Sequence, residues 1–216
     1  YLKRILSLNP PPASRVVLDT DNVLFTAGSM EGIDLLLRAF PHPNQDLVCI
    51  PSPTFSAYSH WSVINGLQVK QVPLLGNNLN QVDIEAIVKL NPKLLFICNP
   101  NNPIGTLIPH PLLKKLCQSL KGFVIIDEAY IEFSEQHSSL FYLNEYPNLI
   151  ILRTFSKGWG LAGVRCGAVL AHKTIIDTLR YIQYPFSVSI PSQHAVRDVL
   201  MAPDKVYEAW KKIKNM

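Results

Sequence analysis

The sequence has no CxxC pair among its four cysteines and no HExxH motif among its six histidines. Spacings of those kinds are typical of zinc sites and disulfide frameworks, so neither kind of site is predicted. Cys49 and Cys98 lie inside apolar runs, where cysteine behaves as a small buried hydrophobe. We therefore expect no metal site, and a reducing, cytoplasmic setting.

Long apolar runs and a strong charge of one sign are also missing. No stretch reaches the roughly 18 apolar residues that a membrane-spanning helix needs, and no signal-peptide pattern opens the sequence. The net charge is +4, and basic residues cluster only at 211–214, which is typical of the solvated face of a helix. These absences argue against membrane and nucleic-acid partners.

Short apolar runs alternate with segments of helical periodicity along the chain. The runs are Val23–Thr26, Leu47–Ile50, Leu94–Cys98, Phe123–Ile126, Leu149–Leu152 and Ala168–Ala171. The helical segments are Glu31–Phe40, Asp83–Leu90, Pro111–Leu120 and Thr174–Tyr181, with further helices expected near Ser192 and Lys205. Strands that are apolar throughout, separated by helices, are typical of a sheet covered on both faces. The predicted fold class is α/β: a doubly wound, mainly parallel sheet with helices on both faces.

Polar, aromatic or glycine-rich residues follow five of these runs. They are Gly28-Ser29-Met30-Glu31, Pro53-Thr54-Phe55, Asn99–Gly105, Asp127-Glu128-Ala129-Tyr130 and Ser156-Lys157. In open α/β sheets, ligands bind beyond the carboxyl ends of the strands. We therefore expect these five segments to gather at one edge of the sheet.

Lys157 follows an apolar run and opens a glycine-rich loop that ends near Arg165. A lysine in such a place is expected to be poorly solvated, which lowers its pKa and favours a neutral, nucleophilic amine. Ser156 and Arg165 supply a hydroxyl and a fixed cation that suit a phosphate group. A reactive amine beside a phosphate site is what a pyridoxal phosphate enzyme needs. The alternative is a solvated lysine in a surface loop.

Each of the other segments has a structural alternative. Gly28-Ser29 before a helix can be an ordinary N-cap, although the same geometry offers backbone N–H groups to a phosphate. Phe55 can be a core residue, and the Asn-Pro-rich segment at 99–105 can be a plain turn. Asp127 can cap a helix or hold magnesium in a Walker B site. The magnesium reading requires a GxxxxGK[ST] loop, which the sequence lacks.

Three segments together resemble the signatures of the fold-type I pyridoxal phosphate aminotransferases: Asn99–Gly105, Asp127–Phe133 and Ser156–Gly167. The sequences DEAYIEF at 127–133 and LAGVRCG at 161–167 are most similar to those of the histidinol-phosphate aminotransferases. Tyr184-Pro185-Phe186-Ser187 before a helix fits the same family. The resemblance runs over nearly the whole chain.

The resemblance implies a cofactor, pyridoxal 5'-phosphate, and three catalytic residues, Lys157, Asp127 and Tyr130. Lys157 would form the Schiff base with the cofactor aldehyde and then move the proton between the substrate Cα and the cofactor. Asp127 would face the pyridine nitrogen and keep it protonated, which makes the ring an electron sink. Asn102 and Tyr130 would bind the ring 3-oxygen.

The resemblance also implies how the ring and the phosphate are held. Phe55 would stack on the ring, with Tyr58 as the alternative. The phosphate would be held by Ser29, Ser156 and Arg165 and by backbone N–H groups of Gly28, Ser29 and Met30. Met30 departs from the acidic residue common at this position in the family, which leaves only the backbone contact expected there.

The implied reaction exchanges the amino group of L-histidinol phosphate with the keto group of 2-oxoglutarate, in histidine biosynthesis. Alternatives are another fold-type I enzyme, either an aromatic aminotransferase or a threonine-phosphate decarboxylase, or an inactive cofactor-binding fragment. Family members are cytoplasmic homodimers, so the full-length protein is expected to be one too.

The family resemblance also predicts how the chain is divided. Residues 1–204 would form the large, cofactor-binding domain, and residues 205–216 would begin a helix leading into a small domain that is missing here. The first residue is Tyr1, which fits a piece of a longer protein. By the resemblance, the missing parts carry the substrate-binding tyrosines and the arginine for the substrate carboxylate. The chain alone is therefore expected to form the cofactor site but to be a poor catalyst.

Overall fold

The structure, a computed structural model, describes residues 18–215. Eight strands form one sheet in the order β1-β8-β7-β6-β5-β2-β3-β4. Their bounds are β1 Val23–Thr26, β2 Leu47–Ser52, β3 Gln68–Leu75, β4 Gln81–Val82, β5 Leu94–Cys98, β6 Phe123–Asp127, β7 Leu149–Thr154 and β8 Gly167–Ala171. The neighbouring pairs β3–β2, β2–β5, β5–β6 and β6–β7 are parallel, whereas β8 is antiparallel to β7 and β1, and β4 is antiparallel to β3. The predicted mainly parallel sheet is confirmed.

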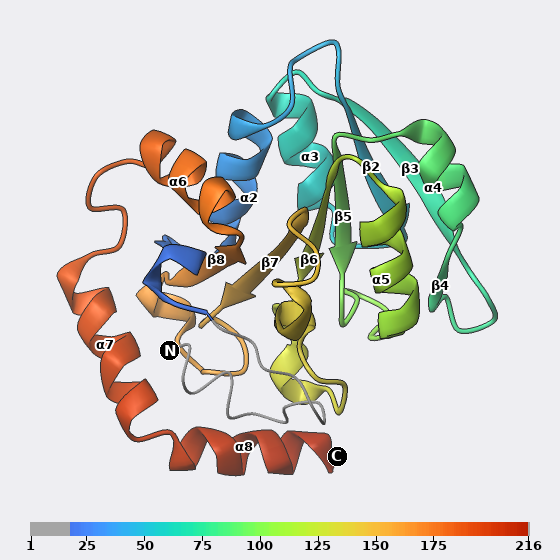
Figure 1. Cartoon of the computed structure of the whole chain (residues 1–216). Coiled ribbons are helices and arrows are strands. Elements are labelled where there is room, and N and C mark those ends of the chain that lie inside the picture. Colours follow the sequence, from blue (N-terminus) through green and yellow to red (C-terminus); the bar gives the residue numbers. More distant parts are fainter. Residues whose placement is uncertain (1–17, 216) are drawn as a thin grey trace.

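Helices cover both faces of the sheet (Figure 1). The α-helices are α2 Ser29–Ala39, α3 Ala57–Ile64, α4 Ile84–Leu90, α5 His110–Ser119, α6 Lys173–Ile182, α7 Ile190–Met201 and α8 Asp204–Lys214. Short 3-10 turns lie at η1 Thr20–Asn22, η2 Ile131–Phe133, η3 Ser139–Tyr142 and η4 Ala162–Val164. Residues of α2, α3 and α6 share one hydrophobic cluster, and residues of α4 and α5 share another.

The strands read as continuous apolar runs because both of their faces are buried. Along β7, Leu149 and Ile151 pack in the cluster with α4 and α5, while Ile150 and Leu152 pack in the cluster with α2, α3 and α6. Every residue of β5, β7 and β8 is buried. Each fully buried Leu or Ile side chain contributes roughly 1.5–3 kcal/mol, so this double-sided core is what holds the sheet in place.

The strand register aligns the carboxyl ends that carry the polar residues. Cys98 on β5 pairs with Asp127 on β6, Asp127 pairs with Leu152 on β7, and Thr154 on β7 pairs with Gly167 on β8. In Figure 1 the arrows of β5 and β7 point toward the side of the molecule where α8 lies. The segments that follow these strands therefore meet at one edge.

A third hydrophobic cluster joins the last two helices to that edge. Its buried residues come from the segment between β7 and β8 and from α7 and α8, and they are Phe155, Trp159, Cys166, Val196, Leu200 and Trp210. The helices expected near Ser192 and Lys205 are thus present. The boundary expected after residue 204 falls at the start of α8, and residues 1–17 of the expected large domain lie outside the described residues. The division into domains stays a prediction.

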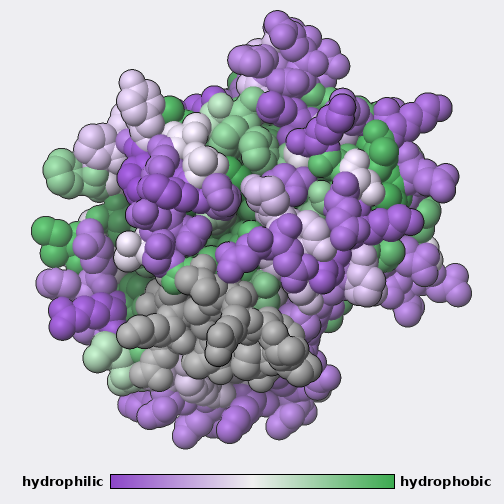
Figure 2. Space-filling view, in the orientation of Figure 1, coloured by the Kyte–Doolittle hydropathy of each residue, from purple (hydrophilic) through white to green (hydrophobic). Residues whose placement is uncertain are grey.

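One region of the described surface is unusually apolar. Four large apolar side chains in and around the connection between α6 and α7, and a fifth at the far end of α7, are 68–98% exposed: Tyr181, Tyr184, Phe186, Ile190 and Met201. Figure 2 shows green, hydrophobic side chains at the left margin, over this connection. Within residues 18–215, no helix is long and apolar enough to cross a membrane. The same residues include no group of three or more His, Cys, Asp or Glu side chains that could hold a metal ion.

Candidate active site

A cavity of about 200 Å³ lies at the carboxyl ends of β5, β6 and β7. Its lining residues are Ser29, Met30, Phe55, Cys98, Asn102, Asp127, Ala129, Tyr130, Thr154, Ser156, Lys157 and Arg165. Of the ten residues predicted to bind a cofactor, nine line this cavity, and the tenth, Gly28, lies directly behind the Arg165 guanidinium. The structure therefore brings the predicted residues together from five separate segments.

The N-terminus of α2 forms one wall of the cavity. Gly28 stands at the N-cap position with φ +76°, a conformation that favours glycine, and no side chain caps the helix. The alternative of a conventional serine cap is thus not found, and Ser29 lines the cavity instead. A Cβ at Gly28 would lie 2.5 Å from Arg165 Nη2, so only glycine lets the guanidinium approach this backbone.

Arg165 and Ser156 complete this wall. Arg165 is exposed and in the left-handed region, with φ +53°. Its Nη1 donates to Ser156 Oγ at 3.2 Å and to the Ala162 carbonyl at 3.0 Å. A guanidinium, two hydroxyls and a helix N-terminus are the donors that bind a phosphate group. This arrangement can hold a phosphate at the start of α2.

Asp127 is the buried acid of the cavity, and it is 3% exposed. Tyr58 Oη donates to its Oδ2 at 2.8 Å, and the Ala129 N–H donates to its Oδ1 at 3.1 Å. Burial raises the pKa of Asp127 from 3.8 to about 6, while the two hydrogen bonds oppose that rise. A buried carboxylate of this kind is stabilised by a cation, such as a protonated ring nitrogen, placed against it.

Tyr58 has a role that the sequence did not reveal. It is fully buried and stacks on Phe96, with ring centroids 5.1 Å apart and an interplanar angle of 14°. Its ring does not line the cavity, so the alternative that Tyr58 stacks on a cofactor ring is wrong. Phe55 does line the cavity and meets Tyr58 edge-on at 5.5 Å. Tyr58 instead orients the Asp127 carboxyl group.

Lys157 lies at the rim of the cavity, with Nζ 5.5 Å from the centre of the Tyr130 ring. Its side chain is exposed, so the expected poor solvation of this lysine is wrong for the chain as described. It lies in the turn after β7, where the next two residues, Gly158 and Trp159, are buried and Lys157 itself remains open to solvent. Asn102 and Tyr130 line the cavity beside it, where their polar groups can face a ring oxygen.

Three cavity residues were not predicted: Cys98, Ala129 and Thr154. Cys98 and Thr154 are the last residues of β5 and β7, so a rule that counts strand ends as site residues would have found them. Thr154 Oγ1 accepts the Ser156 N–H at 3.1 Å and shapes the turn that carries Lys157. Burial raises the pKa of Cys98 to about 12, which makes its thiol a poor nucleophile.

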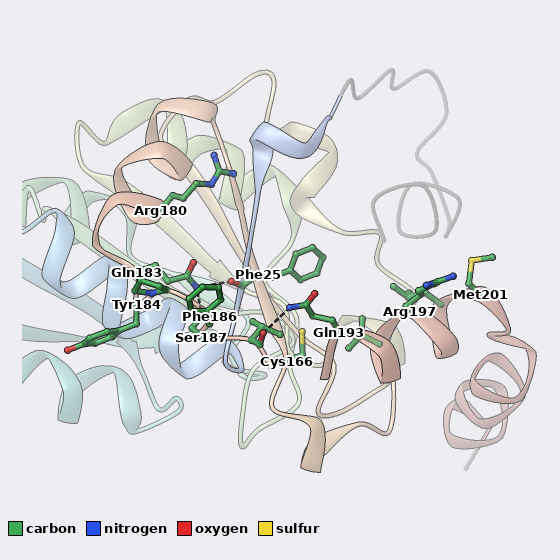
Figure 3. Close-up of a pocket in the computed structure, with 14 residues that line it drawn as sticks. Phe25, Cys166, Arg180, Gln183, Tyr184, Phe186, Ser187, Gln193, Arg197 and Met201 are labelled. Carbon is green, nitrogen blue, oxygen red and sulfur yellow. Dashed lines mark hydrogen bonds between the residues drawn. The ribbon is translucent and has the colours of Figure 1, made fainter. Parts of the chain in front are cut away.

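A second, larger cavity of about 790 Å³ lies between α6 and α7 (Figure 3). Its described walls include Phe25, Tyr184 and Phe186, and they contain no carboxylate. Gln183 and Gln193 are tied into these walls, since Gln183 donates to Ser187 Oγ and Gln193 to the Val188 carbonyl, each at 2.9 Å. The smaller cavity is the candidate active site because it combines an acid, an amine and phosphate donors.

These donors fit pyridoxal phosphate on the evidence of the structure itself. The Asp127 carboxyl group is buried and benefits from a cation, which the ring nitrogen of the cofactor can supply. The Arg165 guanidinium is seated where a Cβ at Gly28 would collide with it, and it faces the α2 N-terminus as a phosphate would require. The Lys157 amine lies at the same cavity.

Comparison with known proteins shows the family to which the chain belongs and relatives of known name. Residues 7–216 match the family model described as aminotransferase class I and II. Histidinol-phosphate aminotransferase of Buchnera aphidicola subsp. Acyrthosiphon pisum (strain Tuc7) is 44% identical over 193 residues, which are 87% of this chain and 52% of that protein. The enzyme of the same name from Cytophaga hutchinsonii is 34% identical, over 92% of this chain and 60% of that protein.

A solved structure shows the same fold. It is histidinol-phosphate aminotransferase from Sinorhizobium meliloti in complex with pyridoxal-5'-phosphate, with a TM-score of 0.82 and 25% identity. The match covers 90% of this chain and 54% of that one. The chain thus spans about half the length of the relatives it matches.

Proposed function

The chain belongs to the aminotransferase class I and II family, and from this premise we propose that it is the pyridoxal phosphate-binding part of a histidinol-phosphate transaminase. The observation that carries the proposal is the cavity in which the Asp127 carboxyl group, the Lys157 amine and the Arg165 guanidinium meet. The cofactor assignment is supported by the family and by the pyridoxal phosphate bound in the Sinorhizobium meliloti enzyme.

Each residue of the cavity has a part in this proposal. Ser29, Ser156, Arg165 and the backbone at Gly28 and Met30 would hold the phosphate. Phe55 would support the ring face, and Asn102 and Tyr130 would bind the ring oxygen. When bound, pyridoxal phosphate supplies an aldehyde and an electron-accepting ring.

Two residues would handle protons. The Lys157 amine would take the proton from the Cα of the amino substrate and return it during the exchange of amino and keto groups. The Asp127 carboxylate would hold the ring nitrogen in its protonated form, and Tyr58 keeps that carboxylate oriented. We infer that L-histidinol phosphate and 2-oxoglutarate are the substrates, which the names of the relatives support. The proposal includes a cytoplasmic homodimer in the full-length protein, by the family resemblance.

The proposal is tested by adding pyridoxal phosphate to the purified chain and recording its visible absorption spectrum. We expect a protein-dependent band that sodium borohydride traps as a covalent adduct on Lys157, located by mass spectrometry. Lys157→Ala should abolish the band. Lys115→Ala, at an exposed position on α5, is the matched control and should leave the band unchanged. A folded wild type with no band, or a band that persists in Lys157→Ala, would contradict the proposal.

A further inference from the structure

A buried ionic cluster lies next to the candidate active site but does not line it. The cluster consists of Arg153 at the end of β7, Glu128 directly after β6, and Glu132 in η2. These residues are 2%, 1% and 6% exposed, respectively. Three charged side chains that are this deeply buried are unusual unless they serve each other as partners.

Hydrogen bonds and ion pairs of the cluster connect four segments of the chain. Arg153 Nη1 lies 3.3 Å from Glu128 Oε2, and Arg153 Nη2 lies 2.6 Å from Glu132 Oε1. Glu128 also accepts from Ser138 Oγ at 2.5 Å and from the Ser139 N–H at 2.6 Å. The guanidinium and the two glutamates together therefore join the ends of β6 and β7 to the turns at η2 and η3.

Glu132 also holds the turn that carries Lys157. Its Oε1 accepts the indole N–H of Trp159 at 3.0 Å. A Cβ at Gly158 would lie 2.7 Å from the Glu132 Cβ, so the glutamate packs directly on the backbone next to Lys157. The turn also contacts α8, where the Trp210 indole donates to the Gly158 carbonyl at 2.5 Å. The turn is thus held by contacts from both η2 and α8.

Each member of the cluster stands one or two residues from a residue of the cavity. Glu128 follows Asp127, Glu132 lies two residues after Tyr130, and Arg153 precedes Thr154. Buried ion pairs contribute little net stability compared with apolar packing, whereas loss of one partner is strongly destabilising. A cluster of this kind is therefore better suited to fix geometry than to add stability.

We propose that Arg153, Glu128 and Glu132 are positioning residues that hold the Lys157 turn in a fixed place relative to Asp127 and Tyr130. The proposal rests on the proposed function, because it concerns the residues assigned there to the cofactor. The link from Arg153 through Glu132 to Trp159 is its central element. It connects the end of β7 with Trp159, which lies two residues after Lys157.

Hydrogen–deuterium exchange on the cofactor-free chain tests the geometry directly. In Glu132→Ala, which removes both bonds of Oε1, we expect amides of residues 155–160 to exchange about tenfold faster or more than in wild type. In Glu132→Gln they should exchange nearly as in wild type, because the amide oxygen can still accept from Arg153 and Trp159. The second oxygen, Oε2, has no partner among the described residues, so its replacement by an amide nitrogen breaks no bond. Trp159→Phe, which removes the indole donor together with part of a buried ring, serves if Glu132→Ala does not fold.

Asn148→Ala is the matched control. The Asn148 side chain donates to three carbonyls, of Cys117, Leu120 and Gly122, just before β7 and thus at the opposite end of the strand from Arg153. Its loss should lower global stability without a selective effect at residues 155–160. If Glu132→Ala and Trp159→Phe accelerate exchange there no more than Asn148→Ala does, the positioning role is overturned.

A second readout uses the bound cofactor. The pH midpoint of its visible absorption depends on how the Lys157 nitrogen is held relative to the groups around it, so we expect a shift of about half a unit or more in Glu132→Ala and Trp159→Phe. Glu132→Gln and Asn148→Ala should keep the wild-type midpoint. An unshifted midpoint in all four variants would count against the positioning role. A wild type that shows no band would instead refute the proposed function, and the exchange data would still decide the role of the cluster.

Discussion

At the scale of single residues, Asp127 shows how the candidate site opposes the stability of the fold. Its pKa is 3.8 in an unfolded chain and about 6 in the folded one. Between these values the folded state binds more protons than the unfolded state, so the free energy of unfolding falls as the pH rises from about 4 to 6. Above pH 6 the ionised carboxylate costs roughly 3 kcal/mol, since each pKa unit corresponds to about 1.4 kcal/mol.

We predict that Asp127→Asn makes the cofactor-free chain more stable at pH 8, by about 2 kcal/mol, because the amide needs no counter-charge. Near pH 4 the advantage should vanish, because Asp127 in wild type is then protonated. Urea denaturation at the two pH values measures the difference. Asp198→Asn, at an exposed position on α7, should show no such pH dependence. An equal gain at both pH values would show that ionisation of Asp127 is not its cause.

The roles of some site residues could be predicted from the sequence, and those of others could not. Asp127 and Lys157 could be predicted because they follow apolar runs that become parallel strands. Tyr58 could not be assigned its role because its partner is 69 positions away, and only the packing of α3 on the sheet brings them together. The sequence left open whether Lys157 is poorly solvated or solvated, because a motif gives no information on how open the rim of a cavity is.

At the scale of elements, the start of α2 determines how the phosphate site is built. Gly28→Ala would place a Cβ 2.5 Å from Arg165 Nη2 in a backbone with φ +76°. We predict a loss of stability of about 1 kcal/mol from the backbone strain. We also predict at least roughly tenfold weaker binding of pyridoxal phosphate, because the guanidinium must move away from its place in the phosphate site.

Gly66→Ala separates these two effects. Gly66 has a similar φ of +71°, but a Cβ there would meet only Pro43, at 3.8 Å. It should cost comparable stability in thermal unfolding and leave the binding constant for pyridoxal phosphate, measured by absorption titration, unchanged. Equal affinities of the two variants would show that Gly28 matters only for the backbone.

Strands with both faces buried could be predicted from the sequence, whereas elements that are mostly exposed could not. All six strands expected from apolar runs are present, within two residues at each end. β3 was missed because five of its eight residues are exposed, which leaves no continuous apolar run. β4 and α3 were missed for related reasons, since β4 has only two residues and α3 buries only Tyr58 and Ser62.

At the scale of the whole molecule, the described cavity offers donors for one phosphorylated ligand. Lys157 and Arg165 are the only cationic side chains among its described lining residues, and both are assigned to the cofactor. Histidinol phosphate carries a phosphate of its own, and 2-oxoglutarate carries two carboxylates. These anions need further cations, and the described cavity does not supply them.

We therefore predict that the chain on its own binds pyridoxal phosphate but converts histidinol phosphate slowly. When substrate is added, the visible absorption band of the lysine-bound cofactor should disappear. Stopped-flow absorption measures how fast it does so, which gives the rate of the first half-reaction. We expect it to lie at least about 100-fold below the roughly 10 s⁻¹ typical of enzymes. Phenylalanine and threonine phosphate serve as comparison substrates. A rate near 10 s⁻¹ with histidinol phosphate would show that the cavity is sufficient.

The pairing of β6 with its neighbours carries a consequence for the chemistry of the molecule. Asp127 and Glu128 are consecutive acids, yet one faces the cavity and the other faces Arg153. Displacing β6 by one position toward its start would put Glu128 in the place of Asp127 and Ala129 in the place of Glu128, so a longer acid would enter the cavity and no carboxylate would be left there for Arg153. A one-residue deletion in this strand would thus change the acid at the cavity without a substitution at any site residue. The register of the backbone hydrogen bonds between β6 and its neighbours therefore determines which acid faces the cavity.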